Sequence, residues 1–368
     1  MEYRLEELFD LQMGKTPSRS VTEYWESGNN KWISIADLSK CGKYIYDTKE
    51  CLSDIAVSES GIKQIPANTV VMSFKLSIGK TAITSEPMYS NEAIMSFRDR
   101  KLVQLLPEYI YYLLLSKNWD DGTNKAVMGK TLNKATLSKV KVNIHSMQEQ
   151  QEIVYVLNQA TALIELHQQQ LQKLDELVKA RFVEMFGGIH DSSLYPYVPV
   201  KELTHVISGG TPSRDVLEYW RDGTIPWVKT TELQNKIITE VDEHITSKGL
   251  AASSAKIVPP NTTLIAMYGQ GKTRGMTGYL GISASTNQAC ACILPSPEIN
   301  SVYIWKYFEL SYDKLRNMAK GGNQPNLNGN MIKNFPVLVP PIKRQEEYVQ
   351  FVNQVDKSKL LQFFCFPI

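Results

Sequence analysis

The chain has 368 residues, enough for two domains, because a single hydrophobic core rarely grows beyond about 250–300 residues. Hydrophobic residues make up 43% and charged residues 21%, which excludes a disordered chain, and the net charge of +2 means that any basic surface must be local. No run approaches the roughly 18 apolar residues of a membrane span, and the charged start MEYRLEELFD does not resemble a signal peptide. We therefore expect a cytoplasmic protein.

Short apolar runs separated by Gly, Pro and Asn predict strands and loops in two stretches of about 145 residues each. The runs at 31–35 and 69–74 lie in the first stretch, and those at 262–268 and 335–339 lie in the second. One helical segment interrupts each stretch, at 107–116 and near 302–310.

Between these stretches, residues 146–186 contain no Gly or Pro and predict one long helix. About 40 residues at 1.5 Å each give a helix on the order of 60 Å long. Gly187 and Gly188 end it, and a Pro-containing segment to Pro199 follows. Spacings of four and three define a heptad seam, interrupted at His167 and Arg181, through Ile153, Leu157, Ala160, Ile164, His167, Leu171, Leu174, Val178, Arg181 and Met185.

The sequence repeats itself at an offset of about 195 residues. Residues 14–25 read GKTPSRSVTEYW and residues 209–220 read GGTPSRDVLEYW. Further matches follow in the same order: Trp32 with Trp227, 66–69 with 259–262, 91–93 with 287–289, 109–110 with 303–304, and 150–152 with 345–347. Chance does not produce such an ordered series, so the chain is a tandem duplication.

The second copy also begins the long helix, because Tyr348, Val352 and Val355 match Ile153, Leu157 and Ala160 of the first. A seam of this kind needs a partner, and an approximate two-fold relation would let the two helices pack as an antiparallel coiled coil. After Lys359 the sequence LLQFFCFPI differs from the matching part of the first helix, so we expect a distal helix that is shorter, as if truncated.

These patterns predict a mixed α/β (α+β) fold. Two similar domains, residues 1–145 and 188–340, are each followed by a helix, residues 146–187 and 341–368. Trp25, Trp32, Trp220 and Trp227 recur in both copies and favour core packing over stacking on bases. Cys290 and Cys292 do not have zinc-site spacing and are interpreted as small buried apolar residues.

Four features resemble type I restriction-modification specificity subunits, in both copies and over nearly the whole chain. They are the TPSR…YW openings, the Trp-x₄-Asp/Glu-Leu segments, the Ile-Gly-Lys region and the Gln-containing start of each long helix. The resemblance implies two target-recognition domains, each reading one half of a split duplex DNA target. It also implies that the paired helices set the spacing and dock adenine-methylating modification subunits, with restriction subunits able to join.

The same resemblance implies a non-catalytic chain without cofactor or metal, because methylation and cleavage belong to the partners. The Asn/Asp-Pro-Pro-aromatic motif of amino-methylating enzymes is not present at 258–261 or 339–342. Two alternatives stay open: a scaffold or silent recombination cassette that does not read DNA, and a nucleotide-dependent enzyme that uses the Gly-Lys segments at 78–81 and 269–275.

Three kinds of segment are candidate DNA contacts. The Ser-Arg pairs after the Thr-Pro turns either contact DNA phosphates or brace the following Tyr-Trp. The Gly-Lys segments either contact phosphates or form plain hairpin turns. The amide-rich segments either hydrogen-bond to adenine or simply form loops. The candidate DNA-binding residues are Lys15, Ser18, Arg19, Lys75, Lys80, Lys130, Asn133, Lys134, Ser213, Arg214, Lys229, Lys272, Arg274, Asn323, Gln324 and Asn328. The candidate partner-binding and coiled-coil residues are Ile153, Leu157, Ile164, Leu171, Leu174, Val178, Tyr348, Val352 and Val355.

Overall fold

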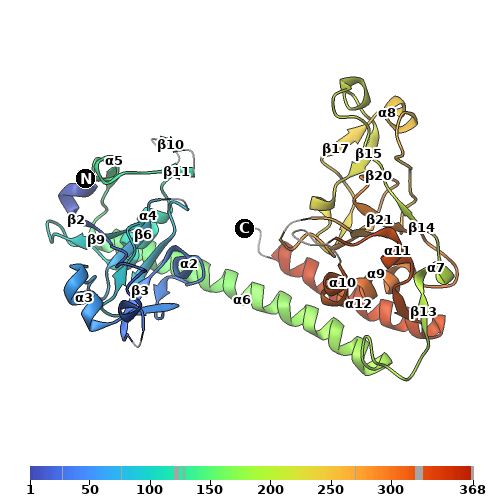
Figure 1. The fold of residues 1–368 in the computed structure, drawn as a ribbon, viewed down its shortest axis with the longest axis horizontal. Helices are drawn as coiled ribbons and strands as arrows, with labels where there is room; N and C mark the ends of the chain where they lie inside the picture. Colours follow the sequence, from blue (N-terminus) through green and yellow to red (C-terminus); the bar gives the residue numbers. More distant parts are fainter. Residues whose placement is uncertain are drawn as a thin grey trace. The chain divides into compact units, whose positions relative to one another are not determined.

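The structure is a computed structural model that describes residues 1–26, 28–75, 77–119, 124–126, 129–269, 271–319 and 326–365, with the backbone alone at 124–126, 129–131 and 361–365. The chain divides into two compact units, Met1–Glu165 and Leu166–Ile368 (Figure 1). The long helix α6 (Met147–Phe186) contributes its first half to the first unit and its second half to the second. Among the described helices, none has the length and apolar character needed to cross a bilayer.

The first unit is built on a five-stranded sheet. Its strands, in spatial order, are β2 (Phe9–Met13), β9 (Ile94–Asp99), β6 (Val70–Ser73), β7 (Thr81–Thr84) and β4 (Tyr44–Ile45). A three-stranded sheet has the order β5 (Glu50–Leu52), β3 (Asn30–Ile33) and β8 (Tyr89–Ser90). Two pairs complete the unit: β1 (Glu2–Arg4) with β12 (Lys141–Asn143), and β10 (Asn124–Ala126) with β11 (Gly129–Thr131).

The central strands are covered on both faces, which explains their continuous apolar runs. Val70 and Met72 of β6 lie in one core with Phe97, whereas Val71 lies in another core with Ile94. Successive side chains of a strand point to opposite faces, so an uninterrupted apolar run fits a strand buried on both sides. The helices of this unit are α1 (Leu5–Leu8), α2 (Ile35–Leu38), α3 (Asp54–Ser60), α4 (Pro107–Leu115), α5 (Lys134–Ser138) and the short η1 (Thr22–Tyr24).

The second unit repeats both sheets and the terminal strand pair of this plan, and among its described residues no pair corresponds to β10 and β11. Its five-stranded sheet has the order β14 (Val206–Ser208), β21 (Cys290–Ile293), β18 (Thr263–Ala266), β19 (Thr277–Leu280) and β16 (Lys236–Ile238). Its three-stranded sheet has the order β17 (Glu243–Ile245), β15 (Ile225–Val228) and β20 (Ser285–Thr286), and β13 (Tyr197–Pro199) pairs with β22 (Pro336–Leu338). Both pairing orders and their parallel and antiparallel senses match those of the first unit.

The helices of the second unit surround this framework. They are α7 (Val200–Leu203), η2 (Leu217–Tyr219), η3 (Thr230–Glu232), α8 (Ser247–Ala251), α9 (Ser301–Leu310), α10 (Tyr312–Met318), α11 (Gly329–Lys333) and α12 (Ile342–Cys365). Cys290 and Cys292 share a core with Leu264 and expose no surface, which confirms that they are buried apolar residues. Burial raises the pKa of the Cys292 thiol to about 11.

In the second unit, α12 packs on the second half of α6 in the antiparallel sense. The ring of Tyr348 lies 5.5 Å from that of Phe182, and the Lys359 ammonium, farther along α12, reaches Asp175, which lies earlier in α6. Figure 1 shows the two helices side by side along this stretch. The two helices therefore run in opposite directions over their shared length.

One buried glutamine near the start of each long helix fixes that helix to its own domain. Gln150 accepts a hydrogen bond from the Leu106 backbone N–H, directly before α4, and donates to the Gln104 and His145 carbonyls. Gln345 makes the matching contacts in the second unit, accepting from the Asn300 N–H before α9 and donating to a backbone carbonyl. The glutamine that recurs in the sequence therefore makes equivalent internal hydrogen bonds in both units.

The mixed α/β fold with two similar domains, predicted from the repeat, is confirmed by these elements and by the comparisons given below. The predicted apolar runs contain β6, β18 and β22 and overlap β3 at 31–33, and the predicted helices coincide with α4, α6 and α9 to within two residues. The short helices were not predicted, because four or five residues give too little periodicity to recognise.

Candidate nucleic-acid interface

The TPSR segment of the first domain ends in an arginine that is held on two sides. Arg19 donates from Nη1 and Nη2 to the two carboxylate oxygens of Glu50 at 2.6 and 3.0 Å, and its guanidinium carbon lies 3.5 Å from the centre of the Trp25 ring. The Trp25 indole in turn donates to the Ser18 carbonyl at 3.1 Å. The hydrogen bonds from Arg19 lower the pKa of the Glu50 carboxyl, so the pair stays charged.

The second domain builds the same clamp. Arg214 donates to Glu243, its guanidinium carbon lies 3.7 Å from the centre of the Trp220 ring, and the Trp220 indole donates to the Ser213 carbonyl at 2.9 Å. Lys229 also contacts Glu243 at 2.9 Å. Burial raises the pKa of the Glu243 carboxyl, but the hydrogen bonds from both cations outweigh it, so the pKa lies below its ordinary value.

These contacts support the bracing role for both arginines. The inner tryptophans, Trp32 and Trp227, are 3% and 2% exposed, and each meets its outer partner edge to face at 5.0 Å. The prediction of core packing is confirmed for Trp32 and Trp227, whereas Trp25 and Trp220 are only partly buried and pack against the same cores. About half of each arginine side chain, 50% and 51%, remains open to solvent, so one edge of each guanidinium can still meet an external group.

Other candidates of the same region are also engaged inside the protein. The Lys15 ammonium donates to the Ser60 carbonyl, and the Ser18 hydroxyl lies 2.7 Å from the Ser20 hydroxyl. Lys15 has no cationic counterpart in the second domain, where Gly210 occupies its position.

The Gly-Lys segments are hairpin turns between antiparallel strands. Lys75 and Lys80 lie on the turn between β6 and β7, and Lys272 and Arg274 lie on the turn between β18 and β19. Gly79 adopts a positive φ of 87°, which a turn of this kind requires. A phosphate-binding loop of a nucleotide hydrolase needs a helix directly after it, but a strand follows in both copies, which speaks against the nucleotide-dependent alternative.

The fold brings these turns together with the amide-rich segments, in both domains and through the same bond. The Leu132 N–H donates to the Phe74 carbonyl at 3.0 Å, and the Leu327 N–H donates to the Met267 carbonyl at 3.0 Å. Each bond joins the residue that follows β6 or β18 to the residue before the asparagine that caps α5 or α11. Two classes of candidate that lie about 60 residues apart in the sequence thus share one face of each domain.

Two of the candidate amides have structural duties. Asn133 caps α5, with its side-chain oxygen accepting from the Thr136 N–H at 2.7 Å, and Asn328 caps α11 by accepting from the Met331 N–H at 3.0 Å. An asparagine whose side-chain oxygen accepts the N–H of the residue three positions later is typical of a helix N-cap. The sequence already contained this signal. Lys134, the first residue of α5, is exposed. Asn323, Gln324 and the side chain of Lys130 lie outside the described residues.

Sequence reasoning missed two lysines. Lys63 and Lys256 are exposed and occupy the same place in the two domains, in the loop that precedes β6 and β18. Each stands two residues before a buried aliphatic residue, Ile65 or Val258, that a proline follows. This Lys-x-Ile/Val-Pro match at an offset of 193 was the signal that could have found them.

The seam residues of the long helices divide into a covered and an uncovered set. Val178, Tyr348, Val352 and Val355 are buried in one core of the second unit, with Leu174 packed against it. Leu171 is half-buried, and Ile153 packs against the core of the first unit. Leu157 and Ile164, both in the first unit, are 37% and 42% exposed.

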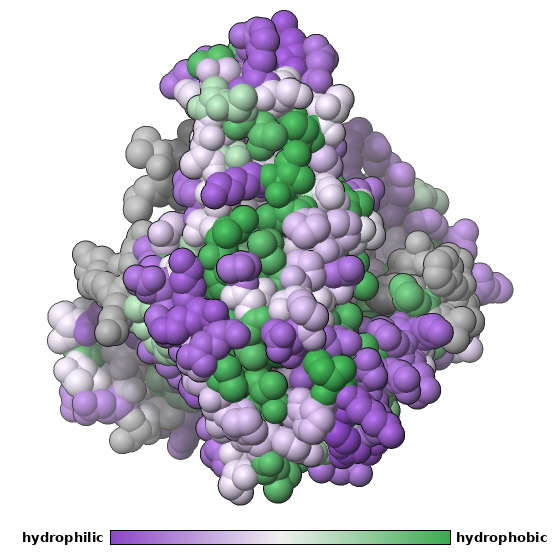
Figure 2. Space-filling view, turned by 90° about the vertical axis from the view of Figure 1, so that its right-hand side faces the viewer, coloured by the Kyte–Doolittle hydropathy of each residue, from purple (hydrophilic) through white to green (hydrophobic). Residues whose placement is uncertain are grey.

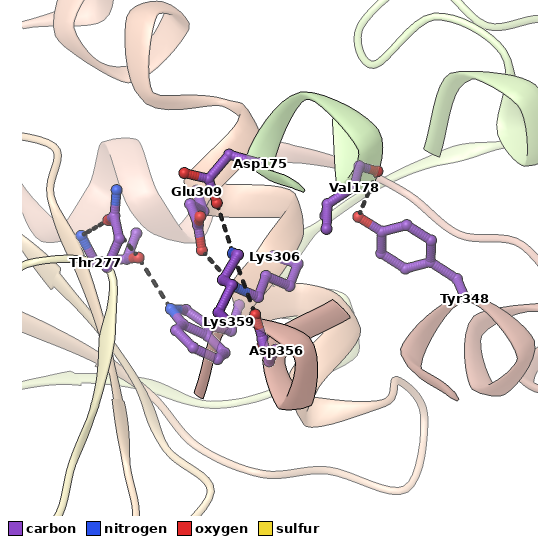
Figure 3. A network of polar contacts seen from close by, with 10 residues as sticks. Asp175, Val178, Thr277, Lys306, Glu309, Tyr348, Asp356 and Lys359 are labelled. Carbon is purple, nitrogen blue, oxygen red and sulfur yellow. Dashed lines mark hydrogen bonds and ion pairs between the residues drawn. The ribbon is translucent and has the colours of Figure 1, made fainter. Parts of the chain in front are cut away.

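A polar network ties the covered seam together (Figure 3). Lys359 contacts Asp175 at 2.6 Å and Asp356 at 3.3 Å, and the Tyr348 hydroxyl donates to the Val178 carbonyl at 3.4 Å. Nearby on α9, Lys306 pairs with Glu309 at 2.9 Å. Burial raises the pKa of the Glu309 carboxyl, against the opposing effect of Lys306. Lys359 therefore ties α12 to α6, whereas Lys306 and Glu309 pair within α9.

Comparison with known proteins finds the same duplication. The family described as type I restriction modification DNA specificity domain matches residues 1–176 and again residues 194–362. The specificity subunit of the type I restriction enzyme MjaIX from Methanocaldococcus jannaschii is 24% identical over 362 residues, which cover 92% of this chain and 82% of that protein. The EcoR124I/EcoR124II specificity subunit from Escherichia coli is 23% identical over 269 residues, 68% of this chain and 63% of its own length.

Solved structures show the same fold. The S subunit of a type I restriction-modification system from M. genitalium superposes with a TM-score of 0.52 at 13% identity, covering 98% of this chain and 90% of that one. A chain from a structure of type I restriction-modification complex assembly and conformational transition gives a TM-score of 0.56 at 14% identity, covering 98% and 91%. With both copies matched over almost their full length, the chain belongs to the type I restriction modification DNA specificity domain family.

Proposed function

We propose that this chain is the non-catalytic DNA-reading subunit of a type I restriction-modification complex, with each domain reading one half of a bipartite duplex target. The observation that carries the proposal is the duplicated face. In both domains the same backbone bond brings the Gly-Lys turn beside the segment that begins with Asn133 or Asn328. The two faces share their framework but differ in their loops, as expected if each reads a different half-site.

The composition of the two faces suits a division of labour. Lysines and arginines at phosphates set affinity and position, whereas side chains at base edges supply sequence information. Lys75 and Lys80 border the face of the first domain, and Lys272 and Arg274 border that of the second. The long helix α6 lies between the two domains in the chain, and a stiff helix fixes the spacing of two half-sites better than a flexible linker would.

The partners we propose are duplex DNA, adenine-methylating modification subunits and restriction subunits. The names of the relatives support a place in a type I restriction enzyme. The uncovered part of the α6 seam, which includes Leu157 and Ile164, offers an apolar surface to a helical partner.

The experiment is co-purification with a methyltransferase (modification) subunit of the type I class, followed by mapping of methylated adenines in DNA exposed to the complex. We expect methylation at a split motif. Exchanging residues 1–145 for those of a relative should change one half of the motif, and exchanging residues 188–340 should change the other.

Two results would refute the proposal. A complex that forms but methylates no specific motif would support the alternative of a silent cassette or non-reading scaffold. A chain that forms no complex and retains no site-specific DNA binding would remove the scaffold role as well. Exchange of both domains together serves as the control, because it should transfer the whole motif of the donor.

A further inference from the structure

Each domain carries an open groove along the edge of its five-stranded sheet. In the first domain a groove of about 340 Å³ lies between the edge strand β2, the loop that ends in Lys63, and Lys134. In the second domain a groove of about 450 Å³ lies between the edge strand β14, Lys256 and helix α11. Since β2 and β14 hold the same position in their sheets, the two grooves are the same feature, present twice.

One wall of each groove carries an equivalent lysine. Lys63 and Lys256 both precede the buried residue that bridges to the start of β8 or β20, so the fold fixes the backbone beside them in the same way. In the first domain, β2 reaches this wall directly, because the Gln12 side-chain amide donates to the Lys63 carbonyl at 3.4 Å.

Each groove is also lined by a lysine of a short helix, at a different position of that helix in the two domains. In the first domain it is Lys134, the first residue of α5, and in the second it is Lys333, the last residue of the equivalent helix α11. The charge is therefore retained at the groove although the residue that supplies it has moved along the helix. A lysine that served only solubility would not be expected at the same groove in both domains.

The charge of both grooves is positive and unneutralised. The first is lined by Lys15, Lys63 and Lys134 with Asp10 as its one acidic residue, and the second by Lys256 and Lys333 with no acidic residue. Within the described part of the chain, no ion pair involves any of these five lysines. Arg19, Arg214 and Lys229, by contrast, are all paired with carboxylates, whereas the charge of the groove lysines is not neutralised by a described carboxylate and is available to a ligand.

The charge of the grooves favours a polyanion as their ligand. Figure 2 views the second unit from the side on which Figure 1 places β13 and β14, and shows hydrophilic residues on both sides of an apolar band, so the preference rests on the lining lysines and not on hydropathy. Several ammonium groups along an open groove attract a row of negative charges, and an ammonium binds phosphate as a point charge without reading a base.

We propose that the two grooves hold the phosphodiester backbone of the DNA duplex beside each half-site, with Lys63 and Lys256 as equivalent phosphate contacts and Lys134 and Lys333 as further contacts in the same grooves. This assignment rests on the proposed function and adds to it. The groove that the two domains share would make the sequence-independent contacts with phosphates, and the loops in which the domains differ would read the bases.

The test uses the complex with its methyltransferase and a duplex that contains the mapped motif. Lys63→Gln with Lys134→Gln, and separately Lys256→Gln with Lys333→Gln, remove two charges from one groove each. Each lost phosphate contact lowers the slope of log affinity against log salt by about 0.9, so each double variant should lower it by about 1.8. The methylated motif should stay unchanged. Lys236→Gln, on β16 at the opposite edge of the same sheet as β14, is the matched control and should leave the slope unchanged.

Each contrary outcome has one meaning. A slope unchanged in both double variants, with folding intact by circular dichroism, overturns the proposal. A change of the methylated motif in one half would make the groove lysines base readers, which also overturns it. Loss of the methyltransferase with an unchanged slope would assign the groove to a protein partner instead. If the wild-type complex methylates no split motif, the proposed function fails, and the salt slope on duplex of random sequence still decides whether the groove binds phosphates.

Discussion

The Lys359 ammonium lies 2.6 Å from the Asp175 carboxylate, joining α12 to α6 across 184 residues of sequence. Asp175 is 64% exposed, so the ion pair contributes little to the stability of the contact. Tyr348, which lies earlier in α12, has no exposed surface. The antiparallel contact thus depends mainly on the aromatic core, and the ion pair adds little to it.

The first prediction compares these two contributions. Tyr348→Ala should destabilise the second unit by about 3–5 kcal/mol, the usual cost of emptying a large aromatic site, whereas Asp175→Asn should cost about 0.5 kcal/mol or less. Tyr348→Phe is the control, since it keeps the ring and loses only the hydrogen bond to Val178. Urea unfolding measures all three, and equal losses for Asp175→Asn and Tyr348→Ala would contradict this assignment.

The second prediction concerns the arginine clamp. Arg19→Gln and Glu50→Gln should show a coupling of at most about 1 kcal/mol in a double-mutant cycle on stability, because both side chains are partly exposed. Neither should change the salt dependence of DNA binding. A fall of the slope by about 0.9 for Arg19→Gln alone would show instead that the outer edge of its guanidinium binds a phosphate.

The third prediction is a pH dependence at His190. Burial, aided by Lys314 and opposed by Asp191, lowers the pKa of this imidazole to about 4, and the Tyr307 hydroxyl lies 3.4 Å from Nδ1. The unfolded chain binds a proton near pH 6.5 and the folded chain only near pH 4. Stability is therefore complete above pH 6.5 and is lost as the pH falls from 6.5 to 4, by about 3 kcal/mol at most.

His190→Asn should flatten this part of the stability profile, measured by unfolding at a series of pH values. The exposed His205 supplies the matched control, since His205→Asn should leave the profile as it is in the wild type. A wild-type profile that is level between pH 6.5 and 4 would refute the assignment.

The fourth prediction concerns the buried glutamines. Gln345→Leu leaves the Asn300 N–H and the Pro340 carbonyl without their partner, and we expect a loss of about 2–4 kcal/mol. Gln150→Leu should have a similar effect in the first unit. The neighbouring Gln151 is exposed, so Gln151→Leu should change the midpoint of thermal unfolding little. Comparable losses at Gln151 and Gln150 would argue against a specific role for the buried amide.

The fifth prediction tests the uncovered seam. Leu157→Ser combined with Ile164→Ser should leave the unfolding free energy of the isolated chain nearly unchanged, because both side chains are already exposed. The same change should weaken co-purification of the methyltransferase if this stripe carries a partner. Lys173→Ser, on an exposed position of the same helix, is the control. Unimpaired co-purification would place the partner elsewhere.

The parts of the fold that depend on local periodicity were open to prediction from sequence. The repeat predicted two equivalent domains, the heptad spacing predicted α6, and the continuous apolar runs predicted β6 and β18. Capping asparagines such as Asn133 also carry a local signal, which an interpretation based on base contacts alone overlooked.

The sequence by itself determined the duplication, the domain order and the family, because these depend on patterns that recur along the chain. Only the tertiary structure decided which cations are neutralised and which are available. Arg19 meets Glu50 from 31 residues away, and Lys63 and Lys134 line one groove together with residues of β2. The charge of a side chain is fixed by its chemistry, but its availability to a ligand depends on which distant groups the fold places beside it, and no local pattern encodes that distance.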